Sequence, residues 1–284
     1  MRSPAIIVGA GRSGTNALRD ALCELDQFHT WPCDEINYIW RHGNRRFPTD
    51  QMSRQNATVK ATAYIRDAFA RRSALVPDAT LIEKTCANSL RVAFVHEVFP
   101  NARFIHIIRD GRDVTASAMS RWTAELDIRY LAAKGRFVPR SDLPFYAYQY
   151  FLSRISKLRS VEDRLSWWGP KFKGMQDLAA SPLEVVAAVQ WERCVSLAFE
   201  QLSEVPPAQV ATVRYQDLVG DSYDELSRIA NFLGEMPEES DLQRAARTLH
   251  ADSKSTWREK LSQEQIELIA PIVAPALELI ESQL

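Results

Sequence analysis

The sequence lacks the features that would assign it at once to several classes of protein. No apolar run approaches the roughly 20 residues that a membrane-spanning helix needs. A strand-like run follows directly after Met-Arg-Ser-Pro, which predicts neither a signal peptide nor a membrane anchor, and we expect a cytoplasmic protein. The formal net charge of −1 also provides no overall basic field for binding nucleic acid.

Cysteine is scarce as well. The four cysteines form no Cys-x-x-Cys pair and have no metal-ligand spacing with the five histidines. We therefore expect neither a disulfide framework nor a metal cofactor. The 35 basic and 36 acidic residues almost balance, so any site for an anion must be local.

Short β-branched runs alternate with apolar residues at helical spacing along the 284 residues. Strands are expected at residues 5–8, 81–83, 103–108 and 210–213, and helices at residues 90–99, 182–202, 223–233 and 263–281. This alternation predicts one α/β domain over residues 1–284, with helices flanking a central parallel sheet. The aromatic, basic and proline-interrupted segment at about residues 130–180 is interpreted as a helical inserted subregion on the acceptor side.

The glycine-rich segment of residues 9–16 lies between the first expected strand and a helix. Backbone N–H groups of such a turn form a nest for a phosphate or another anion. The glycine spacing also matches the dinucleotide fingerprint, which requires a second strand ending at an acidic residue about 20 residues further on. Asp34 and Glu35 stand at that distance, but residues 28–32 lack a strand pattern. An NAD-dependent oxidoreductase and a non-catalytic nucleotide-binding module remain the alternatives from another class.

The same segment does not match the Walker A motif, which needs a lysine directly after the last glycine. Gly14 is followed by Thr15 and Asn16, and the cation lies inside the loop, at Arg12. The run from Arg12 through Ser13 to Thr15 resembles the 5′-phosphosulfate loop of sulfotransferases that use 3′-phosphoadenosine 5′-phosphosulfate (PAPS). Many members carry lysine at this position, and the tyrosyl-protein branch carries arginine.

A second strand-turn-helix unit carries another anion motif. Arg109 follows the expected strand at residues 103–108, and Ser117 comes eight residues later. This pattern resembles the 3′-phosphate motif of the same family. The residue types suit the chemistry, because a guanidinium presents a planar fork to phosphate oxygens and a serine hydroxyl adds a donor. Arg121 matches a cation that touches the nucleotide in the tyrosyl-protein branch.

Two later segments extend the resemblance. Residues 214–218 look like the family's Arg-Tyr-Glu-Asp-Leu strand end, and residues 253–258 resemble the late loop that closes over PAPS. The resemblance implies a P-loop-NTPase-like sulfotransferase fold, PAPS as the donor and adenosine 3′,5′-bisphosphate (PAP) as the product. It implies donor binding by Gly11, Arg12, Ser13, Gly14, Thr15, Asn16, Arg109, Ser117, Arg121, Tyr215, Ser253, Lys254 and Ser255.

The resemblance also implies the catalytic residues. Lys84 stands in Glu-Lys-Thr, which resembles the Glu-Lys-Ser of glycan sulfotransferases, where the lysine lies against the transferring group. Arg12 and Lys84 are expected to stabilise the charge that develops during transfer. Residues 34–39 resemble a Glu-Ile-x-Phe-Phe stretch whose glutamate is the base, so Glu35 is the expected base and Asp34 the alternative. The reaction needs no metal.

The acceptor is predicted less directly. The contexts of Glu35 and Lys84 resemble the glycan and tyrosyl-protein branches rather than the branch that acts on small phenols. Aromatic residues of the inserted segment would suit stacking on a sugar, or they pack as core. Basic residues there, Lys171 among them, suit an acidic glycan or peptide, or form a solvated face. We expect a carbohydrate acceptor, with a tyrosyl peptide or a small-molecule hydroxyl as alternatives.

Overall fold

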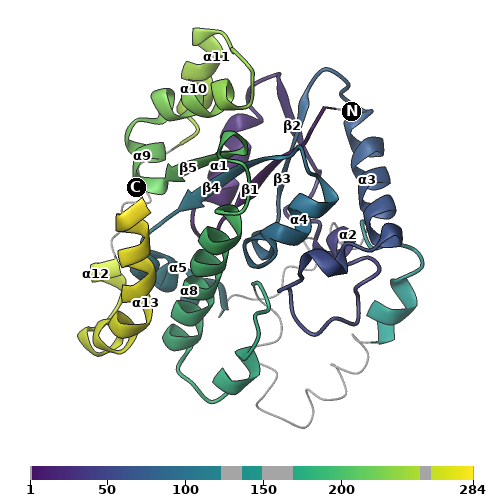
Figure 1. The fold of residues 1–284 in the computed structure, drawn as a ribbon. Coiled ribbons are helices and arrows are strands. Elements are labelled where there is room, and N and C mark those ends of the chain that lie inside the picture. The colour runs from purple at the N-terminus through teal and green to yellow at the C-terminus, as the bar shows by residue number, and fades with distance from the viewer. Residues whose placement is uncertain (1, 123–135, 149–168, 250–256, 284) are drawn as a thin grey trace.

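The computed structural model describes residues 2–122, 136–148, 169–249 and 257–283. Its centre is a five-stranded sheet with the strand order β2-β3-β1-β4-β5 (Figure 1). Every pair of neighbouring strands is parallel, which confirms the predicted sheet. The strands are β1 (Ala5–Val8), β2 (Phe28–Thr30), β3 (Thr80–Lys84), β4 (Arg103–Ile108) and β5 (Val210–Arg214).

The strand register brings the carboxyl ends of the strands to one edge of the sheet. Ile7 of β1 pairs with Lys84 of β3, and Val8 pairs with His106 of β4. On the far side, Ile108 of β4 pairs with Arg214 of β5. The loops that follow β1, β3 and β4 therefore start beside one another, where ligands bind in parallel α/β sheets.

Helices surround the sheet. They are α1 (Thr15–Leu22), α2 (Asn37–Trp40), α3 (Val59–Ser73), α4 (Val92–Val98), α5 (Gly111–Trp122), α8 (Leu183–Leu202), α9 (Tyr215–Gly220), α10 (Ser222–Phe232), α11 (Glu239–Ala246), α12 (Trp257–Lys260) and α13 (Gln263–Gln283), with short 3₁₀ turns at Arg54–Asn56, Cys86–Leu90, Met175–Leu178 and Pro207–Gln209. All four expected helices appear within a few residues. The one expected at residues 90–99 is α4, and Leu90 belongs to the 3₁₀ turn that precedes it.

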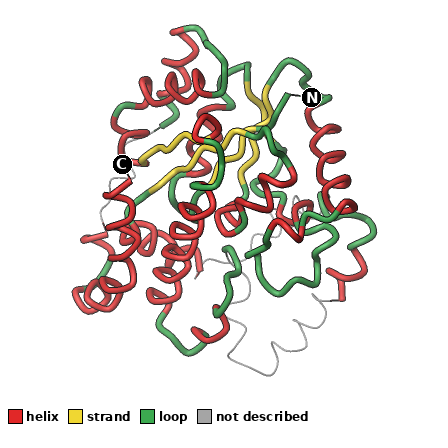
Figure 2. Tube along the Cα trace, viewed as in Figure 1, coloured by secondary structure: helices red, strands yellow, loops and turns green. Residues whose placement is uncertain are grey.

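Alternating side chains of the strands feed two cores, one on each face of the sheet. Ile6 and Val8 pack into the core beneath α2, α3 and α4. Ala5 and Ile7 point the other way, into the core with α1, α10 and α11. A third apolar cluster joins α5, α8 and α13 beside the carboxyl ends of the strands, and Figure 2 shows helices on both faces of the sheet. The sheet is thus buried on both sides, as parallel sheets generally are.

Residues 28–32 are a correction to the sequence analysis, which gave them no strand. Phe28–Thr30 form the edge strand β2, and His29 pairs with Leu81 of β3. The strand is too short for an alternating pattern to show, and Pro32 follows it at once. The dinucleotide fold places its second strand beside the first, whereas β3 lies between β1 and β2 here. The dinucleotide interpretation therefore fails on strand order.

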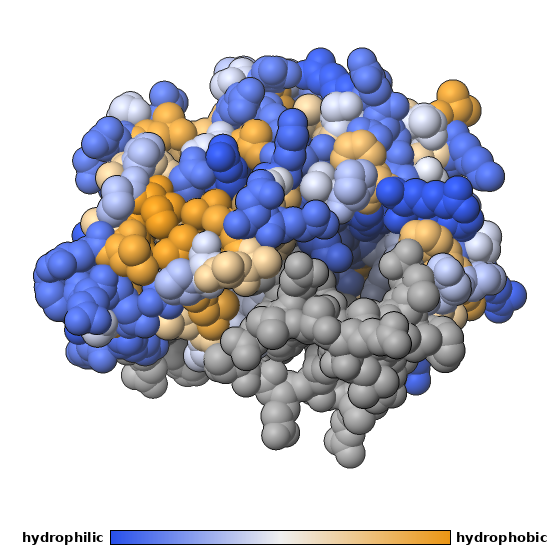
Figure 3. Space-filling model, turned by 90° about the horizontal axis from the view of Figure 1, so that it is seen from below, coloured by the Kyte–Doolittle hydropathy of each residue, from blue (hydrophilic) through white to orange (hydrophobic). Residues whose placement is uncertain are grey.

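About half of the proposed inserted subregion at about residues 130–180 lies outside the described residues. Within it, residues 143–148 are helical and Met175–Leu178 form a 3₁₀ turn. Among the described helices, none has both the length and the apolar character to cross a lipid bilayer. Seen from below, most of the surface that the described residues form is hydrophilic, and the largest apolar patch lies at the left (Figure 3).

Candidate functional site

The loop between β1 and α1 has a curved backbone that only certain residues can adopt. Gly14 has φ +93°, and Arg12 has φ 73°, a left-handed conformation that is rare for a residue with a side chain. A Cβ at Gly14 would lie 2.2 Å from the Tyr215 ring, so no larger residue fits without a shift. The Ser13 hydroxyl is buried and has no hydrogen-bond partner among the described residues. Strained backbone of this kind is concentrated at functional sites.

Arg109, directly after β4, folds back over this loop. Its Nη1 donates a hydrogen bond to the carbonyl oxygen of Arg12 at 3.3 Å. The guanidinium carbon lies 4.3 Å from the centre of the Tyr215 ring, which is a cation–π contact. From α8, Trp191 Nε1 donates to the Arg109 carbonyl at 3.2 Å and fixes the backbone there. Tyr215, the first residue after β5, is thus packed between the two loops.

The two anion motifs meet directly. Arg12 Nε donates a hydrogen bond to Ser117 Oγ at 3.0 Å, although the two residues are 105 positions apart. The residues expected to bind the two ends of one nucleotide are Arg12 on the loop after β1, Arg109 on the turn after β4, and Ser117 on α5, and they therefore lie at one place beside the sheet edge. Two guanidinium groups at this place can bind more than one phosphate or sulfate group.

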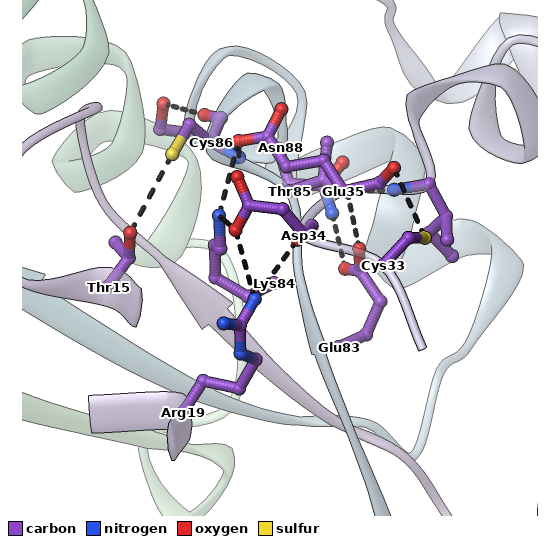
Figure 4. Close-up of polar contacts among 12 residues, drawn as sticks. Thr15, Arg19, Cys33, Asp34, Glu35, Glu83, Lys84, Thr85, Cys86 and Asn88 are labelled. Atoms are coloured by element: carbon purple, nitrogen blue, oxygen red, sulfur yellow. Dashed lines mark hydrogen bonds and ion pairs between the residues drawn. The ribbon is translucent and has the colours of Figure 1, made fainter. Parts of the chain in front are cut away.

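Beyond β2 and β3 lies a second cluster, made of ion pairs. Lys84 Nζ lies 2.8 Å from Asp34 Oδ1 and 3.4 Å from Glu35 Oε1. Asp34 Oδ1 also accepts from Arg19 Nη1 of α1 at 3.0 Å, so two cations share this carboxylate (Figure 4). The structure thus brings together Lys84, Asp34 and Glu35, three of the four residues that sequence analysis proposed for acid–base and charge-stabilising roles, whereas Arg12 lies in the loop after β1. Arg19 was not predicted, and no signal in the sequence singled it out.

The charge on Lys84 is set by its surroundings. Its side chain is only 2% exposed, and burial alone would lower the pKa of the ammonium group. Coupling to Cys86, Glu35 and Asp34 outweighs burial and raises the Lys84 pKa above its ordinary value. Lys84 is therefore a cation at neutral pH, able to donate hydrogen bonds and to stabilise negative charge.

Glu35 is held by the residues that follow β3. Cys86 N donates to Glu35 Oε1 at 3.2 Å, and Ile36 N donates to Thr85 Oγ1 at 3.2 Å. Thr85 Oγ1 in turn donates to Glu83 Oε1 at 2.5 Å. Burial raises the pKa of Glu83 to about 7, in spite of this hydrogen bond. This chain of contacts was missed, but the polar run from Glu83 to Thr85 at the end of a buried strand was a signal for it.

Glu35 also lines a pocket of about 570 Å³. The other lining residues are Asn37, Tyr38, Arg41, Arg45, Arg46, Phe47, Pro48, Asp50, Ala87, Phe145, Tyr146, Gly169, Pro170 and Lys171. Most of these residues belong to the segment after β2, and the others come from the 3₁₀ turn after β3 and from the parts of the predicted insertion that the structure describes. The pocket therefore begins at the carboxylate that sequence analysis proposed as the base.

The remaining predicted residues divide into described and undescribed ones. Thr15 is buried at the start of α1, with its Oγ1 3.7 Å from Cys86 Sγ, whereas Gly11 is partly exposed and Asn16 exposed beside it. Arg121 lies in the last turn of α5, but its side chain is outside the described part of the chain. Residues 253–255, predicted to cover the donor, are also outside the described residues.

Comparisons with known proteins find a partial family match and similar folds. Residues 4–135 match the model of the sulfotransferase family. The sulfotransferase from Alicyclobacillus acidocaldarius shares 14% identity over 100% of this chain and 96% of its own, with a TM-score of 0.56. The sulfotransferase domain from the curacin biosynthetic pathway shares 15% identity over 96% of this chain and 99% of its own, with a TM-score of 0.54. A mouse sulfotransferase complexed with PAP shares 12% identity over 96% of this chain and 83% of its own, with a TM-score of 0.50. No curated protein matches the sequence.

Proposed function

We propose that this chain is a sulfotransferase that transfers the sulfuryl group of PAPS to a carbohydrate hydroxyl, with Glu35 as the base; the match of residues 4–135 to the sulfotransferase family model and the P-loop-like fold support this. The observation that carries the proposal is the hydrogen bond between Arg12 and Ser117. This hydrogen bond joins the two anion motifs, and a bisphosphorylated adenosine needs one such motif at each of its two ends.

The residues at the donor end fit PAPS. Gly14 lets the loop backbone pack directly against the Tyr215 ring, where a Cβ would lie 2.2 Å away, and the buried Ser13 hydroxyl has no partner among the described residues. Arg12 and Arg109 supply positive charge for the phosphosulfate and the 3′-phosphate. The mouse relative complexed with PAP supports this nucleotide class. When bound, PAPS supplies the sulfuryl group, and Gly11, Thr15, Asn16, Arg121 and residues 253–255 complete the proposed donor site.

Lys84 and Arg12 are proposed to stabilise the charge that develops as the sulfuryl group moves. Both are cations that the fold holds in place before the reaction: Lys84 by Asp34 at 2.8 Å, and Arg12 by its backbone conformation and by Ser117. Preorganised cations need little rearrangement in the transition state, which is the main source of electrostatic catalysis. Removing one such donor costs on the order of 10²-fold to 10³-fold in turnover.

Glu35 is proposed to accept the proton of the acceptor hydroxyl. Its Oε1 accepts from Cys86 N and contacts Lys84 at 3.4 Å, and its side chain is 22% exposed on the pocket. Asp34 is the weaker candidate, because its Oδ1 is shared between Lys84 and Arg19 and it does not line the pocket. A carboxylate held by two cations is a poor proton acceptor. Asp34 then orients Lys84, and Glu35 faces the substrate.

The pocket supports a carbohydrate acceptor. The Tyr38 and Tyr146 rings meet edge to face with their centres 4.8 Å apart. Both line the pocket, together with hydrogen-bonding groups such as Asn37 and Arg41. Aromatic surface with polar groups around it suits sugar rings, which have apolar faces and polar edges. The volume, about 570 Å³, lies within the range for small-molecule sites, which is roughly 300–1,000 Å³.

The test is transfer of radiolabelled sulfuryl from PAPS to a panel of acceptors containing glycosides, a tyrosyl peptide and a phenol. We expect the glycosides to be labelled fastest, whereas labelling of the peptide alone would reject the carbohydrate assignment. Thermal shift tests the donor, because a ligand that binds only the folded state raises apparent stability. PAP should raise the melting temperature, and NAD or ATP should not. A protein stabilised by NAD and without transfer activity would contradict the proposed function.

A further inference from the structure

The acceptor pocket contains more positive than negative charge. Its lining includes the basic residues Arg41, Arg45, Arg46 and Lys171, but only two carboxylates, Glu35 and Asp50. The whole chain is close to neutral, at −1, so this local excess is a property of the pocket and not of the protein at large. A concave surface of one sign attracts ligands of the opposite sign.

Two of the four basic side chains are already paired. Arg41 Nη1 lies 2.9 Å from Asp50 Oδ1 and also donates to the Thr49 carbonyl at 2.6 Å. Arg45 Nη1 lies 2.5 Å from Asp142 Oδ1. These arginines build the wall of the pocket, and their charge is largely neutralised there.

Arg46 and Lys171 differ from them. Neither forms an ion pair with any carboxylate in the part of the chain that the structure describes, and both are exposed. The two pocket carboxylates do not compensate them, because Asp50 pairs with Arg41 and Glu35 lies 3.4 Å from Lys84. The excess positive charge of the pocket therefore belongs to Arg46 and Lys171.

Lys171 is held at the pocket by its backbone. Asp50 N donates to the Lys171 carbonyl at 2.6 Å, and Lys171 N donates to Asp50 Oδ2 at 2.8 Å. Burial would raise the pKa of Asp50, but Arg91 and Arg41 outweigh it and hold the pKa below its ordinary value. The carboxylate therefore stays ionised and keeps residue 171 beside the segment that contains Arg46.

We propose that Arg46 and Lys171 bind a negatively charged group of the acceptor, a carboxylate or a sulfate, so that the preferred substrate is an acidic carbohydrate. This inference rests on the proposed function and narrows its substrate class. Each part of the pocket then has its own role. Glu35 faces the reacting hydroxyl, Tyr38 and Tyr146 offer aromatic surface to the sugar, and the two cations bind the acidic substituent. Charge-assisted hydrogen bonds to carboxylate and sulfate oxygens are the strong ones in such sites.

Three p-nitrophenyl β-glycosides that differ only at C6 test the proposal: the glucoside, the glucuronide and the glucoside 6-sulfate. We expect the enzyme to prefer one or both acidic glycosides in kcat/KM, and the better of the two identifies the anionic group. Binding to enzyme loaded with PAP is measured as well, since it does not depend on which hydroxyl accepts the sulfuryl group. A preference for the neutral glucoside in both measurements would overturn the proposal.

The variants Arg46→Ala and Lys171→Ala connect the preference to these residues. Each should lower kcat/KM for the preferred acidic glycoside about tenfold, equivalent to about 1.4 kcal/mol. For the neutral glycoside, kcat/KM should change by less than about twofold. Arg46→Glu should reverse the preference. Arg247→Ala is the control: Arg247 is exposed directly after α11, so this variant loses one positive charge away from the pocket. It should leave kcat/KM for both the acidic and the neutral glycoside unchanged. Equal losses on acidic and neutral glycosides would refute the assignment. Absence of transfer to every acceptor, without stabilisation by PAP, would instead refute the proposed function.

Discussion

The two halves of the candidate site are built by different means. The donor half, on the loops after β1, β4 and β5, consists of tight backbone turns and a few direct contacts, such as Arg12 with Ser117. The acceptor half, beyond β2 and β3, consists of buried or half-buried ion pairs in which Lys84 holds Asp34 and Glu35. Both halves lie at the same edge of one sheet (Figure 1).

This difference indicates what each half controls. A nest of backbone N–H groups recognises phosphate through main-chain geometry, so the donor half depends on glycine positions and on packing. The acceptor half depends on charges that compensate one another across distant segments, so its chemistry depends on which partner is removed. Apart from Arg12, which is also proposed to stabilise the transferring group, substitutions in the donor half should therefore change nucleotide affinity, and substitutions in the acceptor half should change turnover.

The largest effect is expected in the acceptor half. Glu35→Gln should reduce kcat about 10³-fold, because a general base contributes roughly 10²-fold to 10⁴-fold. PAP affinity, measured by calorimetry, should stay within about twofold, since the carboxylate lies among the acceptor-side residues. The matched control is Asp34→Asn, which should reduce kcat less. A larger loss for Asp34→Asn than for Glu35→Gln would assign the base to Asp34.

The next largest effect is expected in the donor half. Arg109→Ala should raise the Kd for PAP about 100-fold, because it removes charge-assisted hydrogen bonds worth about 1.5–3 kcal/mol each. Arg112→Ala is the control within the same segment, because Arg112 forms an ion pair with Asp110. Loss of Arg112 should raise the Kd for PAP about threefold or less. Equal effects of the two substitutions would mean that the segment binds the nucleotide through overall charge and not through Arg109.

The backbone of the donor half is tested by Gly14→Ala. The new Cβ would meet the Tyr215 ring at 2.2 Å in a left-handed conformation, and we expect a loss of about 2 kcal/mol in the free energy of unfolding. Gly174→Ala is the matched control, because Gly174 has a similar φ of +86° but its nearest atom would lie 3.5 Å away. In a Tyr215→Ala background the cost of Gly14→Ala should become smaller, whereas the cost of Gly174→Ala should stay the same. Denaturant unfolding measures the three single and two double variants.

The smallest effect concerns the pH dependence of stability. A residue on the donor-side strand β4 and a residue on the acceptor-side strand β3 change the stability in opposite directions. Burial lowers the pKa of His106 on β4 to about 4 from 6.5, so its contribution to stability is lost as pH falls from 6.5 towards 4. Burial raises the pKa of Glu83 on β3 to about 7 from 4.5, so its contribution is lost as pH rises from 4.5 to 7.

The two pH dependences oppose each other, and a variant can separate them. In His106→Leu the opposing contribution of His106 is removed, so the free energy of unfolding should fall more steeply as pH rises from about 4.5 to 7 than it does in the unmodified protein. The unmodified protein should show a flatter profile over the same interval. Denaturant unfolding across this range measures both, and parallel profiles would mean that His106 does not titrate differently in the folded and unfolded states.

Much of the donor half could be predicted from sequence because its features are local. Each motif follows a β-branched run and precedes a helix, and the parallel sheet brings such loops to one edge. Arg12 and Ser117 therefore meet where the rule for parallel sheets predicts. The roles of these residues in binding PAPS stay predictions until the nucleotide is measured.

The acceptor half could be predicted only in part because its contacts join distant segments. Strand β2 has three residues, too few for a pattern, and its identity depends on pairing with β3. The hydrogen bonds between Asp50 and Lys171 span 121 residues and leave no trace in local composition. Arg19 on α1 contacts Asp34 only because the fold brings α1 beside the end of β2.

The strand order also determines how this protein could be re-engineered. The donor loops leave the interior strands β1 and β4, whereas the acceptor wall leaves β3 and the outermost strand β2. Residues 41–50 can therefore be exchanged for those of another sulfotransferase without touching the interior strands that carry the proposed nucleotide loops. Because this layout separates the proposed acceptor wall from the proposed donor loops, libraries for new acceptors should be confined to that outer wall.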